Sequence, residues 1–232
     1  QLVVGIPAAL ETLFRASFTQ PGVTFVVDGG ALPPFDYPCP LMSLPLAFKT
    51  MLETIPTNIP YLQAPKETIT RWREHLGAAP KLRVGLVTSG AAHHVNDRNR
   101  SIPMALLAPL LTLPCEFHSL QKEFRAEDTA HLSTVITHAE KIIDFADTAA
   151  LIHAMDLIIT VDTSVAHLAG ALGKPVWVLL PRHGVDFRWL LEREDSPWYP
   201  GVRLFRHHSG DEDWSHVLAR VGDALTQRIV TP

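Results

Sequence analysis

The six residues Asp162-Thr163-Ser164-Val165-Ala166-His167 concentrate more potential chemistry than any other stretch of the sequence. They follow an apolar run at 157–161 and precede small residues typical of a packed helix, so we expect a strand ending at Asp162 and a helix starting at Thr163. Thr163 or Ser164 can cap the first N–H groups of that helix. His167, one turn later, lies on the same face. A helix N-terminus beyond a strand favours a phosphate, which these side chains could contact. The alternative is an ordinary cap and a packed histidine.

Two further polar segments follow expected strands. After 82–88 come Ser89 and Gly90, where glycine lets a ligand approach the backbone, and then Arg98 and Arg100, whose guanidinium groups suit phosphate oxygens. A solvated turn with two exposed arginines is the alternative. After 116–120, Gln121 offers donors and acceptors to a base or sugar and Lys122 a point charge, although a surface lysine is equally consistent with the pattern.

Two residues are weaker candidates for nucleoside contacts. Asp147 follows an expected strand at 142–145. Either Asp147 or Thr148 could cap the helix that comes next, and the Asp147 carboxylate could instead hold a ribose hydroxyl. Trp198 and Tyr199 could stack on a base or sugar ring or simply pack, and for Trp189 we expect packing.

Composition excludes several classes of function. The 232 residues are 47% hydrophobic and 19% charged, with a formal net charge of −4, which favours a folded core and argues against a duplex nucleic-acid binder. Cys39 and Cys115 are isolated, and no H-E-x-x-H motif accompanies the 12 histidines, so we expect no metal and no disulfide framework. The isolated cysteines fit a reducing setting, so we expect a cytoplasmic location. We expect no membrane span, because no apolar run is long enough.

The order of the elements predicts an α/β fold with a parallel sheet. Strands are expected at 82–88, 116–120, 142–145, 157–161, 176–180 and 202–205. Helices are expected at 103–111, 126–139, 148–155, 163–172, 187–192 and 214–229. Strands alternating with helices favour a parallel sheet covered on both faces, with ligands beyond the carboxyl ends of its strands.

Residues 1–77 differ in character from residues 78–232, so we predict two units. A strand, a helix and a strand are expected at 2–4, 8–18 and 23–27. Eight prolines between Pro33 and Pro65 exclude long regular elements, and the interleaved apolar residues predict an ordered, packed loop region with a short helix near 47–53. A helix at 66–76 is expected to connect the units.

Several motifs occur in the order found in one known family. The motifs are Val84-Gly85-Leu86-Val87-Thr88-Ser89-Gly90, Asn96-Asp97-Arg98-Asn99-Arg100-Ser101-Ile102-Pro103, Ser119-Leu120-Gln121-Lys122, Asp144-Phe145-Ala146-Asp147-Thr148-Ala149-Ala150-Leu151, and Asp162 through Pro175. With them the chain resembles glycosyltransferase family 9, the heptosyltransferase-like glycosyltransferases. Pro33-Pro34-Phe35-Asp36, Cys39-Pro40-Leu41-Met42-Ser43-Leu44-Pro45 and the segment from Trp189 to Tyr199 resemble most closely the variant at the carboxyl end of bacterial tetratricopeptide-repeat proteins.

This resemblance implies a GT-B-like fold: two Rossmann-like halves, of which 78–232 would hold a nucleotide-sugar donor and 1–77 would be a truncated acceptor-side half. Thr163, Ser164 and His167, assisted by Lys122 and the loop from Arg98 to Arg100, would hold the donor diphosphate without a metal. Asp162, Gln121, Ser89 and Gly90 would complete this site, with Asp147 and Trp198 near the ribose or base.

Two departures from the family pattern qualify these expectations. Ser164 stands where heptosyltransferases typically have Gly, which leaves the sugar open, and the acidic general base is expected upstream of Gln1, so the catalytic residues are unknown. The predicted function is metal-independent transfer of a sugar from a nucleotide donor to an unknown saccharide or protein acceptor, with tetratricopeptide repeats expected upstream. The alternatives are a non-catalytic nucleotide-sugar-binding or protein-interaction module and a nucleotide-sugar epimerase.

Overall fold

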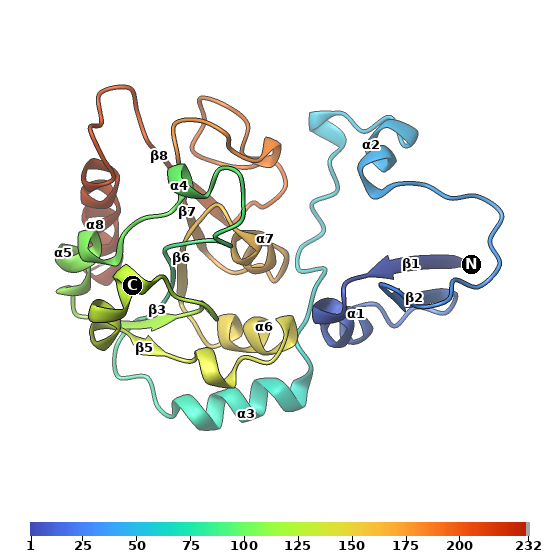
Figure 1. The fold of residues 1–232 in the computed structure, drawn as a ribbon, viewed down its shortest axis with the longest axis horizontal. Helices are drawn as coiled ribbons and strands as arrows, with labels where there is room; N and C mark the ends of the chain where they lie inside the picture. The colour runs from blue at the N-terminus through green and yellow to red at the C-terminus, as the bar shows by residue number, and fades with distance from the viewer. Residues whose placement is uncertain (231–232) are drawn as a thin grey trace.

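The computed structural model describes residues 1–230 and shows an α/β protein with two separate parallel sheets (Figure 1). The larger sheet has six strands in the order β5-β4-β3-β6-β7-β8. They are β3 (Arg83–Val87), β4 (Glu116–Ser119), β5 (Ile136–Thr137), β6 (Leu157–Val161), β7 (Val176–Leu180) and β8 (Val202–Arg206). All of its neighbouring strands pair in parallel, which confirms the predicted fold class.

Two layers of helices cover this sheet because its central strands are apolar on both faces. Every residue of β3, β6 and β7 is buried, as expected for a parallel sheet between helices. Helices α6 (Phe145–His153) and α7 (Ser164–Ala171) pack on one face. Helices α5 (Ala108–Leu111) and α8 (Ser215–Val230) pack on the other, as Figure 1 shows.

The strand order has a switch point between β3 and β6. The chain runs from β3 outward to β4 and β5, and then returns to place β6 on the other side of β3. Connections that leave neighbouring strands in opposite directions open a crevice at their carboxyl ends, where ligands of such sheets bind. The segments singled out in the sequence follow β3, β4 and β6 and therefore meet at this crevice.

The amino-terminal part forms a smaller unit beside the larger sheet (Figure 1). Strands β1 (Leu2–Ile6) and β2 (Val23–Val27) pair in parallel and flank α1 (Glu11–Ser17). Phe14, Phe18 and Phe25 form an aromatic cluster there. Helix α3 (Lys66–Leu76) has the predicted bounds and packs on α6.

The proline-rich segment is ordered but not packed as predicted. It holds only short elements, α2 (Leu44–Ala47) and 3₁₀ turns at Leu41–Ser43 and Leu52–Thr54. Tyr37 is 93% exposed and Phe48 77%. Prolines prevent a regular helix or strand that could turn one apolar face inward. The prediction of a packed region was therefore wrong for the part around Tyr37 and Phe48, whereas Ile59 and Leu62 do pack against the core.

Two other predicted elements differ from the structure. The strand expected at 142–145 does not form, because the Asp144 carboxylate accepts hydrogen bonds from the N–H groups of Ala146 (2.8 Å) and Asp147 (3.2 Å) and starts α6 there. The helix expected at 126–139 is a 3₁₀ helix, Ala126–Thr134, followed by β5. Shorter 3₁₀ helices also stand at Ala8–Leu10, Met104–Leu107, Ala139–Lys141 and Phe187–Trp189, with a single α-turn, α4, at Asp97–Arg100.

Candidate functional site

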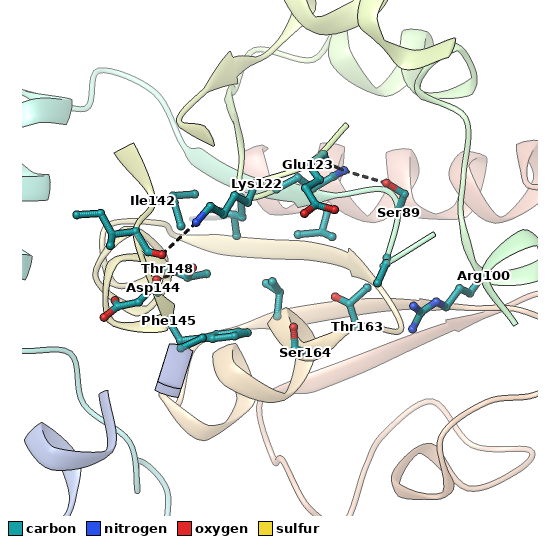
Figure 2. Close-up of a pocket in the computed structure, with 18 residues that line it drawn as sticks. Ser89, Arg100, Lys122, Glu123, Ile142, Asp144, Phe145, Thr148, Thr163 and Ser164 are labelled. Carbon is teal, nitrogen blue, oxygen red and sulfur yellow. Dashed lines mark hydrogen bonds between the residues drawn. The ribbon is translucent and has the colours of Figure 1, made fainter. Parts of the chain in front are cut away.

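A cavity of about 370 Å³ opens at the carboxyl ends of β3, β4 and β6. Its walls come from the four segments expected to converge: the loop after β3 with Arg100, the loop after β4, the start of α6, and the start of α7. Figure 2 shows Lys122, Ser89, Thr163 and Arg100 around this space. The parallel sheet brings these segments together because the carboxyl ends of its strands share one edge.

The start of α7 forms one wall of the cavity through Thr163, Ser164 and Val165. Thr163 is the N-cap residue, but within the described residues its side chain does not cap the helix; its Oγ1 lies 3.2 Å from Oγ1 of Thr160. The predicted side-chain cap was therefore wrong. The first backbone N–H groups of a helix without such a cap are available to an anion, and the helix dipole adds to their attraction.

Arg100 brings a guanidinium group to the cavity and is held from two sides. Its Nη1 donates to the Asp162 carbonyl oxygen at 2.8 Å, and its Nε lies 3.7 Å from Oδ1 of the buried Asp97. Asp97 also pairs with Arg125. Gly90 allows this placement, since a Cβ atom built there would lie 2.2 Å from Arg100 Nη2. Glycine at this position lets the guanidinium lie against the backbone of the loop after β3.

Gln121 and Lys122 line the cavity in different ways. The buried Gln121 accepts hydrogen bonds from Thr88 N (2.7 Å) and Thr88 Oγ1 (3.0 Å), and its Nε2 donates to Ser89 Oγ at 2.9 Å. These hydrogen bonds of Gln121 therefore hold the loops after β3 and β4 together. The exposed Lys122 donates from Nζ to the Ile143 carbonyl oxygen at 3.1 Å, as Figure 2 shows. Because the carbonyl oxygen that accepts this bond is neutral, the positive charge of Lys122 is still available to an anion.

Asp162 ties the loop after β7 to the start of α7. Its carboxylate accepts from Trp189 Nε1 at 2.8 Å and from Asp186 N at 3.0 Å. Trp189 is fully buried, as expected. Because both carboxylate oxygens are engaged by protein groups, Asp162 positions the surrounding loops.

His167 lies one turn along α7, among aromatic rings. Its Nδ1 is 3.2 Å from the Tyr199 hydroxyl, and its ring stacks on Trp189 with centroids 4.9 Å apart. Burial lowers the pKa of His167; Arg188 acts in the same direction, while Asp186 and Asp162 oppose it. Burial also raises the pKa of the Tyr199 hydroxyl. His167 does not line the cavity with Thr163 and Ser164.

Four other predicted residues also lie outside the lining of the cavity, one of which is Asp162. Arg98 is exposed on α4. The buried Asp147 accepts hydrogen bonds from Trp72 Nε1 (2.9 Å) and Ile143 N (2.9 Å) and pairs with Arg71, so it joins α3 to α6. Trp198 packs edge-on against Phe187 with ring centroids 5.6 Å apart.

The sequence did not single out several residues that line the cavity. Glu123 and Asp144 add two carboxylates, Phe145 adds an aromatic ring, and Ala9 reaches it from the smaller unit. Asp144 replaces Asp147 as the cap of α6. The clue was present, because Asp144 stands three residues before Asp147 and the cap position depends only on where the helix begins.

No cluster of three or more His, Cys, Asp or Glu side chains within residues 1–230 is arranged to hold a metal ion. No helix in that described part of the chain is long and apolar enough to cross a membrane.

Comparison with known proteins finds a match to one family over part of the chain. Residues 111–181 match glycosyltransferase family 9 (heptosyltransferase). The resemblance to glycosyltransferase family 9 is confirmed. The family-9 match includes the loop after β4 and the starts of α6 and α7, which together form three of the four cavity walls.

Other relatives extend the similarity beyond this segment. Protein FlbA of Caulobacter vibrioides is 30% identical over 202 residues, which are 82% of this chain and 33% of that protein. The family-9 glycosyltransferase structure from Veillonella parvula has a TM-score of 0.51 at 12% identity and covers 74% of this chain and 54% of its own. The structure of E. coli ADP-heptose LPS heptosyltransferase II has a TM-score of 0.45 at 16% identity. That match covers 76% of this chain and 57% of the E. coli chain. The chain thus spans a third of FlbA and just over half of each structure, and its fold is GT-B-like.

Proposed function

We propose that this chain binds a nucleotide sugar in the cavity and forms the donor side of a metal-independent glycosyltransferase. The observation that carries the proposal is the convergence of Arg100, Lys122 and the uncapped start of α7 on one cavity. Cationic side chains and free helix N–H groups are the partners that phosphate oxygens prefer. The family-9 match over three of the four walls supports a glycosyl donor as the ligand.

The chemistry of transfer follows from where negative charge develops. When the bond between the sugar and the diphosphate breaks, charge accumulates on the departing phosphate oxygens. Arg100, Lys122 and the N–H groups of α7 stabilise that charge, as fixed dipoles and cations do in other group transfers. These groups perform the role that a divalent cation has elsewhere, which is the basis for proposing a metal-independent reaction.

A thermal-shift panel of nucleoside diphosphate sugars and free nucleotides tests this proposal. We expect at least one nucleoside diphosphate sugar to raise the melting temperature. Lys122→Met should weaken that ligand about fivefold, in line with one exposed charge pair. Lys66→Met is the matched control, because Lys66 is an exposed lysine at the start of α3, outside the cavity. No stabilisation by any nucleotide, or equal effects of the two substitutions, would contradict the proposal.

A non-catalytic nucleotide-sugar-binding module is the second candidate, and one observation favours it. Of the described residues that line the cavity, Ala9 alone comes from residues 1–77, and its methyl side chain cannot act as a general base. Ligand binding without sugar transfer or hydrolysis would favour this module. Conversion of the nucleotide sugar to its epimer without an acceptor would instead favour an epimerase.

The donor sugar, the acceptor, a cytoplasmic location and upstream tetratricopeptide repeats stay predictions from the sequence. For the acceptor, transfer of labelled sugar to a candidate saccharide or protein by the full-length polypeptide is the direct assay.

A further inference from the structure

The proline-rich part of the chain leaves many large apolar side chains in contact with solvent. We call residues 32–52 the apolar segment. Six of its side chains are 64–93% exposed: Tyr37, Leu41, Met42, Leu46, Phe48 and Met51. Its only charged residues are Asp36 and Lys49, whose charges cancel. An apolar surface of this extent on a folded protein marks a place where another molecule binds.

The other elements of the protein do not cover the apolar segment. Within the described residues 1–230, every hydrogen bond of residues 31–58 is made inside the range 31–59. Figure 1 shows this part of the chain as a long loop that carries α2. Five prolines between Pro33 and Pro45 restrict its backbone, so the loop loses little conformational freedom when a partner binds.

Both ends of the apolar segment are fixed to elements that line the cavity. Before the segment, Asp28 N donates to the Ile6 carbonyl oxygen at 2.9 Å, which holds the end of β2 against the end of β1. Ala9, three residues after Ile6, lines the cavity. After the segment, Tyr61 N donates to the Ala171 carbonyl oxygen at 3.1 Å, at the end of α7. The start of α7 forms a wall of the same cavity.

The side chains of the apolar segment distinguish between a saccharide and a protein as the acceptor. Saccharide hydroxyl groups need hydrogen-bond partners, because a hydroxyl group that is placed against an apolar surface loses its bonds to water. Exposed aliphatic side chains such as Leu41 and Leu46 offer no such partner. Apolar side chains of a polypeptide, in contrast, gain stability when they are buried on this surface.

We propose that the apolar segment is the docking surface for the acceptor, and that the acceptor is a polypeptide that presents apolar side chains. This inference rests on the proposed function and adds to it the class of acceptor. Contacts with side chains such as Leu46 and Phe48 supply the affinity. The attachments of the segment to β1 and α7 keep the docked polypeptide beside the cavity.

Fluorescence anisotropy with labelled probes, in the absence of nucleotide, tests this assignment. The probes are synthetic peptides with leucine or phenylalanine at every second position, matched peptides with aspartate at those positions, and a malto-oligosaccharide. Only the apolar peptides should bind. Leu46→Ser should weaken their binding about tenfold, because one leucine contact is lost. Leu191→Ser is the matched control and should leave the affinity unchanged, since Leu191 is a comparably exposed leucine outside the segment (76% against 83% for Leu46).

Several results would overturn the docking assignment. They are no binding of the apolar peptides, an equal loss in Leu46→Ser and Leu191→Ser, or binding of the malto-oligosaccharide that Leu46→Ser weakens. A dimer in sedimentation velocity that Leu46→Ser dissociates would also overturn it, because a second copy of the chain would then occupy the surface.

The docking assignment and the proposed function can fail separately, because the peptides are titrated without nucleotide. Stabilisation by a nucleoside diphosphate sugar without peptide binding would overturn the docking assignment alone. Peptide binding by a chain that no nucleoside diphosphate sugar stabilises would overturn the proposed function, and the acceptor role of the peptide with it.

Discussion

Gly90→Ala is expected to displace the Arg100 guanidinium from the cavity. The new methyl group would lie 2.2 Å from Nη2 and 2.6 Å from Cζ of Arg100, well inside van der Waals contact. The end of an arginine side chain can move aside, so the steric clash itself is relieved. The movement breaks the 2.8 Å hydrogen bond to the Asp162 carbonyl oxygen, and a hydrogen bond from a charged group contributes about 1.5–3 kcal/mol. We therefore expect the free energy of unfolding to fall by about 2 kcal/mol.

A double-mutant cycle measured by urea denaturation isolates this mechanism. In an Arg100→Ala chain the space beside Gly90 is empty, so the second substitution, Gly90→Ala, should cost less than about 0.5 kcal/mol. Gly90→Ala alone and Arg100→Ala alone should also weaken the stabilising nucleotide sugar to a similar extent. An equal cost of Gly90→Ala in both backgrounds would refute the reasoning, because it would show that Arg100 is not what the methyl group displaces.

Three further predictions concern buried residues outside the lining of the cavity, Asp147, His138 and Gly170. Asp147→Ala should lower the free energy of unfolding by about 2 kcal/mol, measured in urea, since the buried indole N–H of Trp72 loses its acceptor. Burial, with smaller effects from neighbouring cationic and histidine groups, lowers the pKa of His138 to about 4. The unfolded chain therefore binds more protons below about pH 6.5, so stability should fall by about 2 kcal/mol between pH 7 and pH 5. His138→Gln should reduce this pH dependence. Gly170→Ala should lower the melting temperature, because its Cβ would lie 2.6 Å from the packed ring of Tyr199.

Sequence patterns predicted the positions of the cavity walls well, for a physical reason. Apolar runs such as Leu157–Val161 and Val176–Leu180 have the length and composition of buried parallel strands, and they form β6 and β7 with the predicted bounds. Once the sheet is parallel, the segments after its strands must share one edge. The convergence of Gly90, Lys122 and Thr163 follows from that geometry alone.

The directions of individual side chains could not be predicted, because they depend on distant partners. His167 is on the expected helix, but its contact with Tyr199, 32 residues later, holds it among aromatic rings and away from the cavity lining. Asp162 is held in the same way by Trp189, 27 residues later. The spacing along one helix carries no information about such partners, so local periodicity could indicate the site but not its detailed geometry.

The most direct test of the account is to map the bound nucleotide sugar by backbone amide NMR shifts. Titration with the nucleoside diphosphate sugar that stabilises the chain should give its largest shifts at Ser164 and Val165, at the start of α7, and at Gly90. The shifts should saturate with the affinity measured by calorimetry. Saturable shifts confined to the groove between α5 and α8, around Leu110 and Leu218, would contradict the assignment of the cavity as the donor site.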